Sequence, residues 1–108
     1  MQRGEIWWVD FGPTVCGEIQ KRRPAVIVSN DSANRHANRV QVVPVTSNVG
    51  RLYPCDAAVT IDGKPCRAMA DQLMTVSKQR LAGRMGSVTT NELRALEAAI
   101  RIQLVLVV

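Results

Sequence analysis

Two polar groups of residues, each beside an apolar segment, could together bind a phosphate. They are Lys21, Arg22 and Arg23, before an apolar segment that begins at Pro24, and Thr46, Ser47 and Asn48, after a second apolar segment. If the two segments pair as antiparallel strands, Arg23 and Thr46 reach the same edge of the sheet. An arginine facing a hydroxyl there, with backbone N–H groups nearby, would suit a phosphate. A turn whose polar side chains satisfy local backbone groups is the competing interpretation, and spacing alone favours it.

The other residues that could do chemistry carry weaker signals. His36, the only histidine, lies in a polar run and is expected at the surface rather than in proton transfer. The thiols of Cys55 and Cys66 would need a neighbouring base to act as nucleophiles, and the sequence supplies none. Asp71 and Gln72 form either a strand-borne polar pair that points into a site or a plain turn.

Length and composition indicate one small soluble domain. The chain has 108 residues, of which 46% are hydrophobic and 21% charged, so a disordered chain is excluded. Four aromatic residues are too few for a protein that stacks many bases of a single strand. Trp7 and Trp8 must point to opposite faces of one strand, so we expect one in the core and the other at an interface rather than serving as a base-stacking platform.

Compartment and metal content follow from the cysteines and the chain ends. Three cysteines at no metal-like spacing, with a single histidine, cannot build a structural zinc site. Free thiols indicate a reducing compartment. The N-terminus has no apolar signal segment, and the apolar tail at 104–108 is too short to span a bilayer. We therefore expect a cytoplasmic protein.

The positive charge is concentrated in one third of the chain. The whole chain carries 14 basic and 9 acidic residues, a net charge of +5, and residues 19–54 contain one acid, Asp31. The cations in that stretch are Lys21, Arg22, Arg23, Arg35, Arg39 and Arg51. Such a local surplus suggests a polyanionic partner, with nucleic acid first, although a solvated basic face is an equal alternative.

Many short strands and one terminal helix are predicted. Strands are expected at residues 5–11, 24–29, 40–46, 57–61 and 84–88, with one or two more within 66–76. The segment 24–29 is apolar almost throughout, so we expect it to be buried on both faces. Asn30, Asp31 and Ser32 can each cap a short helix that runs to about residue 38, because each side chain can accept a hydrogen bond from a free backbone N–H.

The terminal helix has the clearest pattern. Thr89 and Glu92 match a capping box, and Leu93, Leu96, Ile100 and Leu104 then share one helical face. The elements together predict a mainly β fold, a small, strongly bent sheet or barrel with the helix packed against it.

Five blocks of sequence occur in order along nearly the whole chain. They are residues 3–7 (Arg-Gly-Glu-Ile-Trp), Pro13 with Gly17 and Glu18, residues 23–31 (Arg-Pro-Ala-Val-Ile-Val-Ser-Asn-Asp), residues 43–48 (Val-Pro-Val-Thr-Ser-Asn), and Asp71-Gln72 followed by residues 75–81 (Thr-Val-Ser-Lys-Gln-Arg-Leu). Each block alone is weak. In register they resemble the MazF/PemK family of toxin endoribonucleases.

The resemblance implies both a fold and an activity. The fold would be an SH3-like barrel of the MazF/Kid/CcdB type, with about six to seven strands, a short helix after the second strand and a C-terminal helix. Residues 1–108 would form a single toxin endoribonuclease domain that acts as a homodimer. It would cut single-stranded RNA, either mRNA or tRNA or rRNA, at short sequence motifs with no metal or other cofactor. Attack by the 2′-OH would leave 2′,3′-cyclic phosphate and 5′-OH ends and inhibit translation and growth.

The resemblance also implies which residues act. The family's catalytic pair maps to Arg23 and Thr46, and the loop at 14–22 would gate substrate and meet the antitoxin, an acidic and partly disordered segment. RNA-binding positions are expected among Glu18, Lys21, Arg22, Ser47, Asn48, Arg51, Arg67, Asp71 and Gln72. Because the pKa of an arginine exceeds ~12, Arg23 suits charge stabilisation or proton donation, and the general base stays unassigned.

The chain departs from the family pattern at two positions. Gly17 stands where some members carry a histidine, and Met69 stands where some carry a basic residue. Arg67 would share that face if its segment is a strand. Because of these departures, a mechanism that needs a third catalytic residue is less supported, and the expected catalysis rests mainly on Arg23 and Thr46.

Rival functions come from other classes of protein. A non-catalytic toxin of the same fold that inhibits DNA gyrase by binding is the main alternative, and fold alone would not separate the two. A small SH3-like binding module would need an aromatic-lined groove, which four aromatic residues hardly supply. A degenerate toxin that binds its antitoxin without cutting is a third possibility. The pair Arg23 and Thr46 favours the nuclease, because a gyrase binder needs no such pair.

Overall fold

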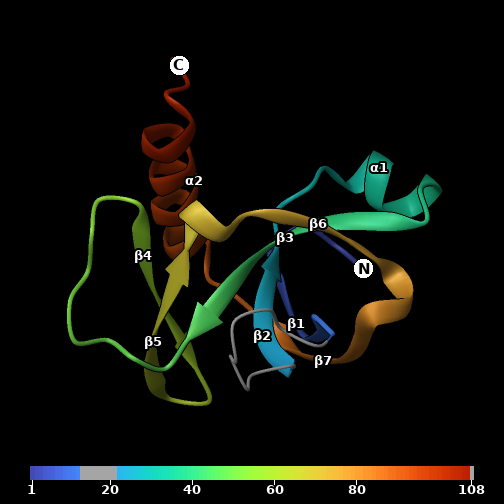
Figure 1. Cartoon of the computed structure of the whole chain (residues 1–108), viewed down its shortest axis with the longest axis horizontal. Helices are drawn as coiled ribbons and strands as arrows, with labels where there is room; N and C mark the ends of the chain where they lie inside the picture. The colour runs from blue at the N-terminus through green and yellow to red at the C-terminus, as the bar shows by residue number, and fades with distance from the viewer. Residues whose placement is uncertain (13–21, 108) are drawn as a thin grey trace.

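The computed structural model describes residues 1–12 and 22–107, which form seven strands and two helices (Figure 1). The strands are β1 (Glu5–Asp10), β2 (Arg22–Ile27), β3 (Arg39–Thr46), β4 (Asp56–Ile61), β5 (Lys64–Met69), β6 (Met74–Ser77) and β7 (Leu81–Ser87). The helices are α1 (Asp31–His36) and α2 (Thr90–Leu104), and 3₁₀ turns lie at Ala70–Gln72 and Lys78–Arg80. The mainly β class with a short helix after the second strand and a C-terminal helix is confirmed.

The strands form one curled antiparallel sheet. Their order is β4-β5-β3-β2-β1-β7, and β6 pairs with β3 outside this path. The strand β3 changes partner along its length, because residues 39–42 pair with β6 whereas Val45 and Thr46 pair with β5. This change of partner bends the sheet. Within the described residues the outer strands β4 and β7 do not pair with each other, so the sheet is a half-barrel.

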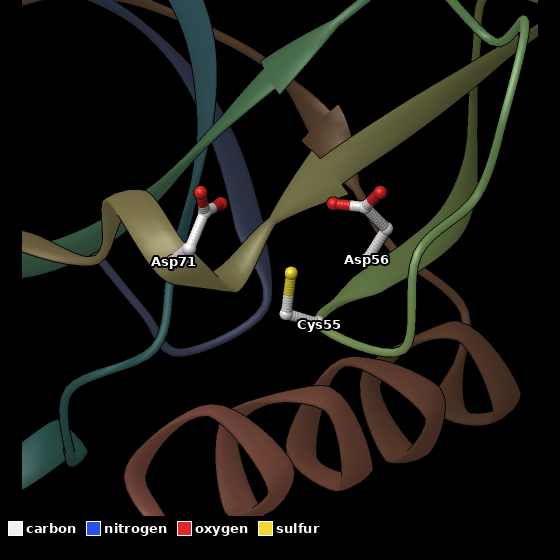
Figure 2. Close-up of side chains that lie close together, drawn as sticks. All are labelled: Cys55, Asp56 and Asp71. Carbon is white, nitrogen blue, oxygen red and sulfur yellow. The ribbon is translucent and has the colours of Figure 1, made fainter.

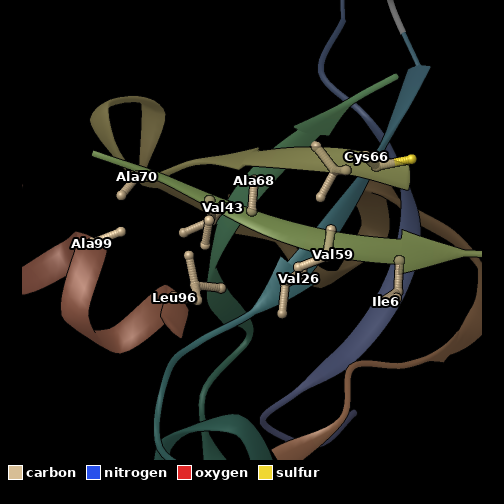
Figure 3. Close-up of a cluster of buried hydrophobic side chains, with 11 residues drawn as sticks. Ile6, Val26, Val43, Val59, Cys66, Ala68, Ala70, Leu96 and Ala99 are labelled. Carbon is tan, nitrogen blue, oxygen red and sulfur yellow. The ribbon is translucent and has the colours of Figure 1, made fainter. Parts of the chain in front are cut away.

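Both faces of the central strands are buried. Side chains alternate between the faces, so Val43 and Val45 of β3 join one apolar cluster and Val40 and Val42 join another. The first cluster lies between the curled sheet and α2, which contributes Leu96 and Ala99 (Figure 3). The remaining members of the first cluster are Ile6, Val26, Ala57, Val59, Cys66, Ala68 and Ala70. The second cluster adds Val9, Ala25, Ile27 and Val76.

Local sequence explains where the helices begin. The side chain of Asn30 accepts a hydrogen bond from the Ala33 N–H at 2.8 Å and starts α1. Thr89 and Glu92 form the predicted capping box, with side chain and backbone bonded in both directions at 3.1 Å and 2.8 Å. The turn between β4 and β5 is built from Asp62 and Gly63, both at positive φ.

A backbone contact holds the segment before β1 against α1. The N–H of Arg3 donates to the Asp31 carboxylate at 2.7 Å, and this hydrogen bond is the main cause of the lowered pKa of Asp31. The Arg3 guanidinium also forms an ion pair with Glu97 of α2 at 2.8 Å.

Several predicted boundaries were wrong. Strand β2 begins at Arg22, so Arg22 and Arg23 belong to the strand, and β7 begins at Leu81 rather than at 84. The helix α1 ends at His36 instead of reaching residue 38. Leu104 is not buried with the apolar face of α2 but is 49% exposed, at the point where the helix ends and Val105 takes a left-handed conformation. No helix in the described part of the chain is both long and apolar enough to cross a membrane.

Candidate active site

Arg23 and Thr46 lie opposite each other at one end of the sheet. Strands β2 and β3 are antiparallel neighbours, and their ladder pairs Ala25 with Pro44. Two residues further along each strand, the same register places Arg23 opposite Thr46. Both residues are half-buried, and both line one cavity of about 420 Å³. The prediction that Arg23 and Thr46 reach the same edge of the sheet is therefore confirmed, whereas Lys21 lies outside the described residues.

The cavity lies where several strands end. Its lining residues come from β1, β2, β3, β7 and the β4–β5 hairpin, and they are Trp8, Arg22, Arg23, Pro24, Val45, Thr46, Ser47, Ile61, Asp62, Lys64, Cys66 and Met85. Arg23 and Thr46 alternate with Pro24 and Val45 along their strands, so the lining draws on both faces of the sheet. The cavity thus wraps around the strand ends instead of covering one face. Among the residues that the structure describes, three lining cations outnumber one acid, Asp62, which suits a phosphate.

The Thr46 hydroxyl is held by the turn that follows it. Its Oγ1 accepts a hydrogen bond from the Asn48 N–H at 3.2 Å, and the Asn48 side chain accepts one from the Gly50 N–H at 3.2 Å. The turn interpretation of residues 46–48 is therefore correct as well. Since the Thr46 oxygen is an acceptor in this contact, its own proton can be donated elsewhere. A turn that fixes the hydroxyl and a site that uses it are compatible.

Arg67 is the register partner of Thr46 in β5, so the two share one face of the sheet. This confirms that the segment around Arg67 is a strand. The guanidinium is already engaged, because its Nη1 donates to Asp56 Oδ2 at 3.3 Å and to the Arg51 carbonyl at 3.0 Å. Asp56 also accepts the Tyr53 N–H at 2.8 Å. Arg67 thus anchors the loop between β3 and β4 beside Thr46.

Cys55, Asp56 and Asp71 form the one group in the described residues that has metal-ligand side chains in reach of one another. Their ligand atoms lie within 4.8 Å, and Figure 2 shows the thiol below and between the two carboxylates. The Arg67 cation is paired with Asp56, where it offsets the negative charge that a divalent ion would need. The group therefore belongs to the loop anchor and is not assigned to a metal.

The remaining predicted RNA-binding residues lie in different places. Arg22 and Ser47 line the cavity, whereas Asn48 and Arg51 lie exposed in the loop that follows β3, with the Arg51 guanidinium 4.9 Å from the centre of the Tyr53 ring. Asp71 and Gln72 are exposed in the 3₁₀ turn after β5, so the strand-borne alternative was wrong and the turn was right. Glu18, Lys21 and most of the loop at 14–22 lie outside the described residues.

Two other sequence candidates stay outside the cavity or play no chemical part in it. His36 is exposed at the end of α1, where its Nδ1 contacts the Ser32 carbonyl at 2.9 Å. Cys66 lines the cavity but is buried, and its thiol donates to the Lys64 carbonyl at 3.6 Å. The Cys55 thiol lies outside this cavity but within 4.8 Å of the Asp56 and Asp71 carboxylates, potential bases that the sequence did not place beside it.

Sequence reasoning missed the walls of the cavity. Trp8, Ile61, Asp62, Lys64 and Met85 line it, and none of them was a predicted site residue. The available signal was the pair Trp7-Trp8, because alternation along a strand points the two side chains to opposite faces. Alternation could not tell which of the two faces the cavity, because both faces of this sheet are buried.

The chain is a curled antiparallel sheet with a C-terminal helix. An arginine and a threonine at the ends of its central strands line one cavity, so the molecule is a small β protein with a candidate phosphate site. Residues 2–104 match the family model of the PemK-like, MazF-like toxins of type II toxin–antitoxin systems. The chain belongs to this family.

Two relatives that align with nearly the full length of the chain support the family assignment. The chain is 41% identical to endoribonuclease MazF9 of Mycobacterium tuberculosis over 113 aligned positions, which cover 96% of both chains. It is 31% identical to the endoribonuclease toxin MazF of Escherichia coli strain K12, over 92% of this chain and 89% of the relative. Both are named endoribonucleases, so this chain is a member of an enzyme family.

Solved structures agree with the fold. A mycobacterial endoribonuclease in complex with its cognate antitoxin superposes with a TM-score of 0.84 at 27% identity, covering all of this chain and 98% of the other. MazF from Deinococcus radiodurans gives a TM-score of 0.83 at 23% identity, over 98% of this chain and 97% of the other. The second likeness bears on the fold alone.

Proposed function

We propose that this toxin is a sequence-specific, metal-independent endoribonuclease that cleaves single-stranded RNA and thereby inhibits translation and growth. The observation that carries the proposal is that Arg23 and Thr46 line the same cavity, whose described lining residues carry more positive than negative charge. The names of the full-length relatives support the same activity. The substrate is a stretch of mRNA, tRNA or rRNA.

The proposed chemistry uses the nucleophile that RNA already carries. The 2′-OH loses its proton and its oxygen attacks the adjacent phosphorus, while the bond from phosphorus to the 5′-oxygen breaks and that oxygen takes up a proton. The products are a 2′,3′-cyclic phosphate and a 5′-OH. Arg23 and the Thr46 hydroxyl donate hydrogen bonds to the phosphate as its charge builds, and one such donor contributes about 3 kcal/mol. DNA lacks the 2′-OH and should resist cleavage.

We further propose two protein partners. An acidic, partly disordered antitoxin segment would fill the same cationic cavity and block it. The solved complex of a mycobacterial endoribonuclease with its cognate antitoxin supports an antitoxin as partner. A second copy of the chain would complete a homodimer, which the resemblance to the family implies. Exposed aliphatic side chains at residues 102–107 support such an interface.

The test is cleavage of a long single-stranded RNA and the matching DNA by the purified, antitoxin-free protein in EDTA. We expect discrete cuts in RNA with cyclic-phosphate ends, and none in DNA. Arg23→Ala and Thr46→Ala should each lower the rate by about 10²–10³-fold while the variants stay folded. Thr46→Ser retains the hydroxyl and should keep most of the activity, and Arg94→Ala, at an exposed position of α2, is the matched arginine control.

Two outcomes would count against this proposal. Full activity of both alanine variants would show that the site is misassigned. No cleavage by the folded protein would favour the non-catalytic alternative, a toxin of the same fold that binds DNA gyrase, and gyrase inhibition would then be measured.

A further inference from the structure

The two adjacent tryptophans have different environments. Trp7 packs against the second apolar cluster, and its Nε1 donates to Glu5 Oε1 at 3.0 Å. Trp8 points to the other face, remains 40% exposed and lines the cavity that Arg23 and Thr46 share. A large aromatic side chain left 40% exposed on an interior strand is costly unless something covers it in the working state. Because Trp8 lies beside the candidate phosphate site, the group that covers it is expected to be part of a ligand bound at that site.

The strands on either side leave the Trp8 ring open. Its register partners are Pro24 of β2 and Gly83 of β7, and neither has a long side chain. A Cβ placed on Gly83 would meet no atom of residues 1–12 or 22–107 within 4 Å, so these residues leave free space on that flank. Gly83 is not in the left-handed region, so nothing in its backbone conformation requires a glycine. The absence of a side chain there keeps the space beside Trp8 clear.

The cavity combines an apolar wall with charged edges. Ile61 and Met85 accompany Trp8, while Arg22 and Lys64 bring positive charge and Asp62 brings an acceptor. A volume of about 420 Å³ lies within the range of small-molecule sites. A flat ring with polar edges that is attached to a phosphate has this chemistry, whereas an aliphatic protein side chain would leave the cations unused.

We propose that Trp8 is the stacking surface for a nucleobase of single-stranded RNA, in the nucleotide next to the phosphate held by Arg23 and Thr46. The inference rests on the proposed function and deepens it by assigning a base subsite. Stacking on Trp8 contributes affinity, and the edges that Asp62 and Lys64 present contribute to the choice of base. Gly83 belongs to the subsite because its missing side chain leaves room for the base to lie flat on the Trp8 ring.

The first test measures binding without cleavage. Trp7→Phe leaves Trp8 as the sole tryptophan, since the chain has two. Mixed-sequence single-stranded DNA, which lacks the attacking 2′-OH, is titrated into this variant while tryptophan fluorescence is recorded. We expect strong quenching of Trp8 at saturation. The Trp8→Phe variant, which retains Trp7, should show little quenching with unchanged affinity.

The second test uses variants that remove or block the surface. Trp8→Ala should weaken DNA binding and raise the KM for RNA by about tenfold or more, with a smaller change in kcat, and Trp8→Phe should restore both. Gly83→Val fills the open flank and should weaken binding to a similar extent although Trp8 is intact. Ala58→Val, at an exposed position of β4, is the matched control for the added side chain.

The outcomes separate this inference from the proposed activity. Wild-type KM and DNA affinity in both Trp8→Ala and Gly83→Val would overturn the base subsite, even if Arg23-dependent cleavage is observed. Quenching of Trp8 by DNA in a protein that cuts no RNA would support the subsite and refute the nuclease. If Trp8→Ala does not fold, the Gly83→Val variant and the fluorescence titration still test the base subsite. Quenching by antitoxin but not by nucleic acid would assign Trp8 to a protein interface instead and overturn the inference.

Discussion

At the scale of single residues, the arginines of the site have different tasks. Arg23 lines the cavity, whereas Arg67, its neighbour across Thr46 in the sheet, is engaged with Asp56 and the Arg51 carbonyl. The Asp56 side chain is only 3% exposed, so its charge depends on that arginine. Arg67 therefore holds the loop after β3 in place, and its contribution to activity would come through Thr46 and that loop.

We expect Arg67→Ala to destabilise the fold by about 3 kcal/mol, because it leaves a buried carboxylate without its cation. Both contacts of Arg67 come from one nitrogen, Nη1, so Arg67→Lys should recover part of the loss. Urea unfolding measures both effects. The double variant Asp56→Ala/Arg67→Ala should lose less than the sum of the two single variants, since the pair is coupled.

An RNA-contact role for Arg67 would give a different pattern. Stability would then change little in Arg67→Ala, and the salt dependence of RNA binding would become shallower by about one phosphate contact. That result would return Arg67 to the RNA-binding residues that the sequence suggested.

The sequence could predict the meeting of Arg23 and Thr46 because it needs only one antiparallel pair and two strand ends. It could not predict Trp8, because the choice between Trp7 and Trp8 depends on which face of a doubly covered sheet opens at the cavity. The contact between Arg67 and Asp56 depends on the register of the β4–β5 hairpin, which pairs Asp56 with Met69 and Arg67 with Ala58. Composition and residue spacing alone could not predict that register.

At the scale of elements, one glutamate joins the terminal helix to the sheet. Glu92 Oε1 accepts the Thr89 N–H at 2.8 Å in the capping box, and its Oε2 accepts the Thr60 N–H of β4 at 2.7 Å. The strand β4 is the outer strand of its half of the sheet, and α2 packs against it (Figure 1). Glu92 thus satisfies a backbone donor of the helix and one of an edge strand.

Glu92→Ala should lower the free energy of unfolding by about 2 kcal/mol, since two backbone N–H groups lose their acceptor. Thr89→Ala removes the reciprocal bond alone and should cost about 1 kcal/mol. Denaturant unfolding monitored by circular dichroism distinguishes the two, with Arg94→Ala on the exposed face of α2 as the control. Equal losses for Glu92→Ala and Thr89→Ala would show that the bond to Thr60 contributes nothing.

The elements were predictable where short-range rules decide. The capping box of α2 and the Asp62-Gly63 turn depend on residues within a few positions of one another, and both formed as expected. The start of β2 was wrong because pairing with β1 draws Arg22 and Arg23 into the strand, with Arg23 opposite Val9. The end of the apolar face was wrong because Leu104 is the last residue of α2, where it is 49% exposed, and the buried residues of the helix are Leu96 and Ala99.

At the scale of the whole molecule, the half-barrel separates two surfaces. The cationic cavity lies at the ends of β2 and β3, and the exposed aliphatic segment lies at the end of α2. Figure 1 shows the C-terminus at the far tip of α2, away from the strand ends of β2 and β3. Catalysis and subunit contact can therefore use different parts of one small chain, and a variant can change one without the other.

The proposed homodimer gives the last prediction. Ile102, Leu104 and Leu106 are each about half exposed, and Val105 and Val107 are 83% and 97% exposed, which places five aliphatic residues at the surface of one short segment. Such a patch is unusual on a monomer and suits burial against a second copy. The double variant Leu104→Asp/Leu106→Asp should therefore shift the mass measured by light scattering from twice 11.9 kDa to 11.9 kDa. Arg94→Ala/Ala95→Asp, on the exposed face of the same helix, should remain dimeric. A wild-type protein that is already a monomer would refute the homodimer, and an unchanged dimer in the aspartate variant would move the interface to another face.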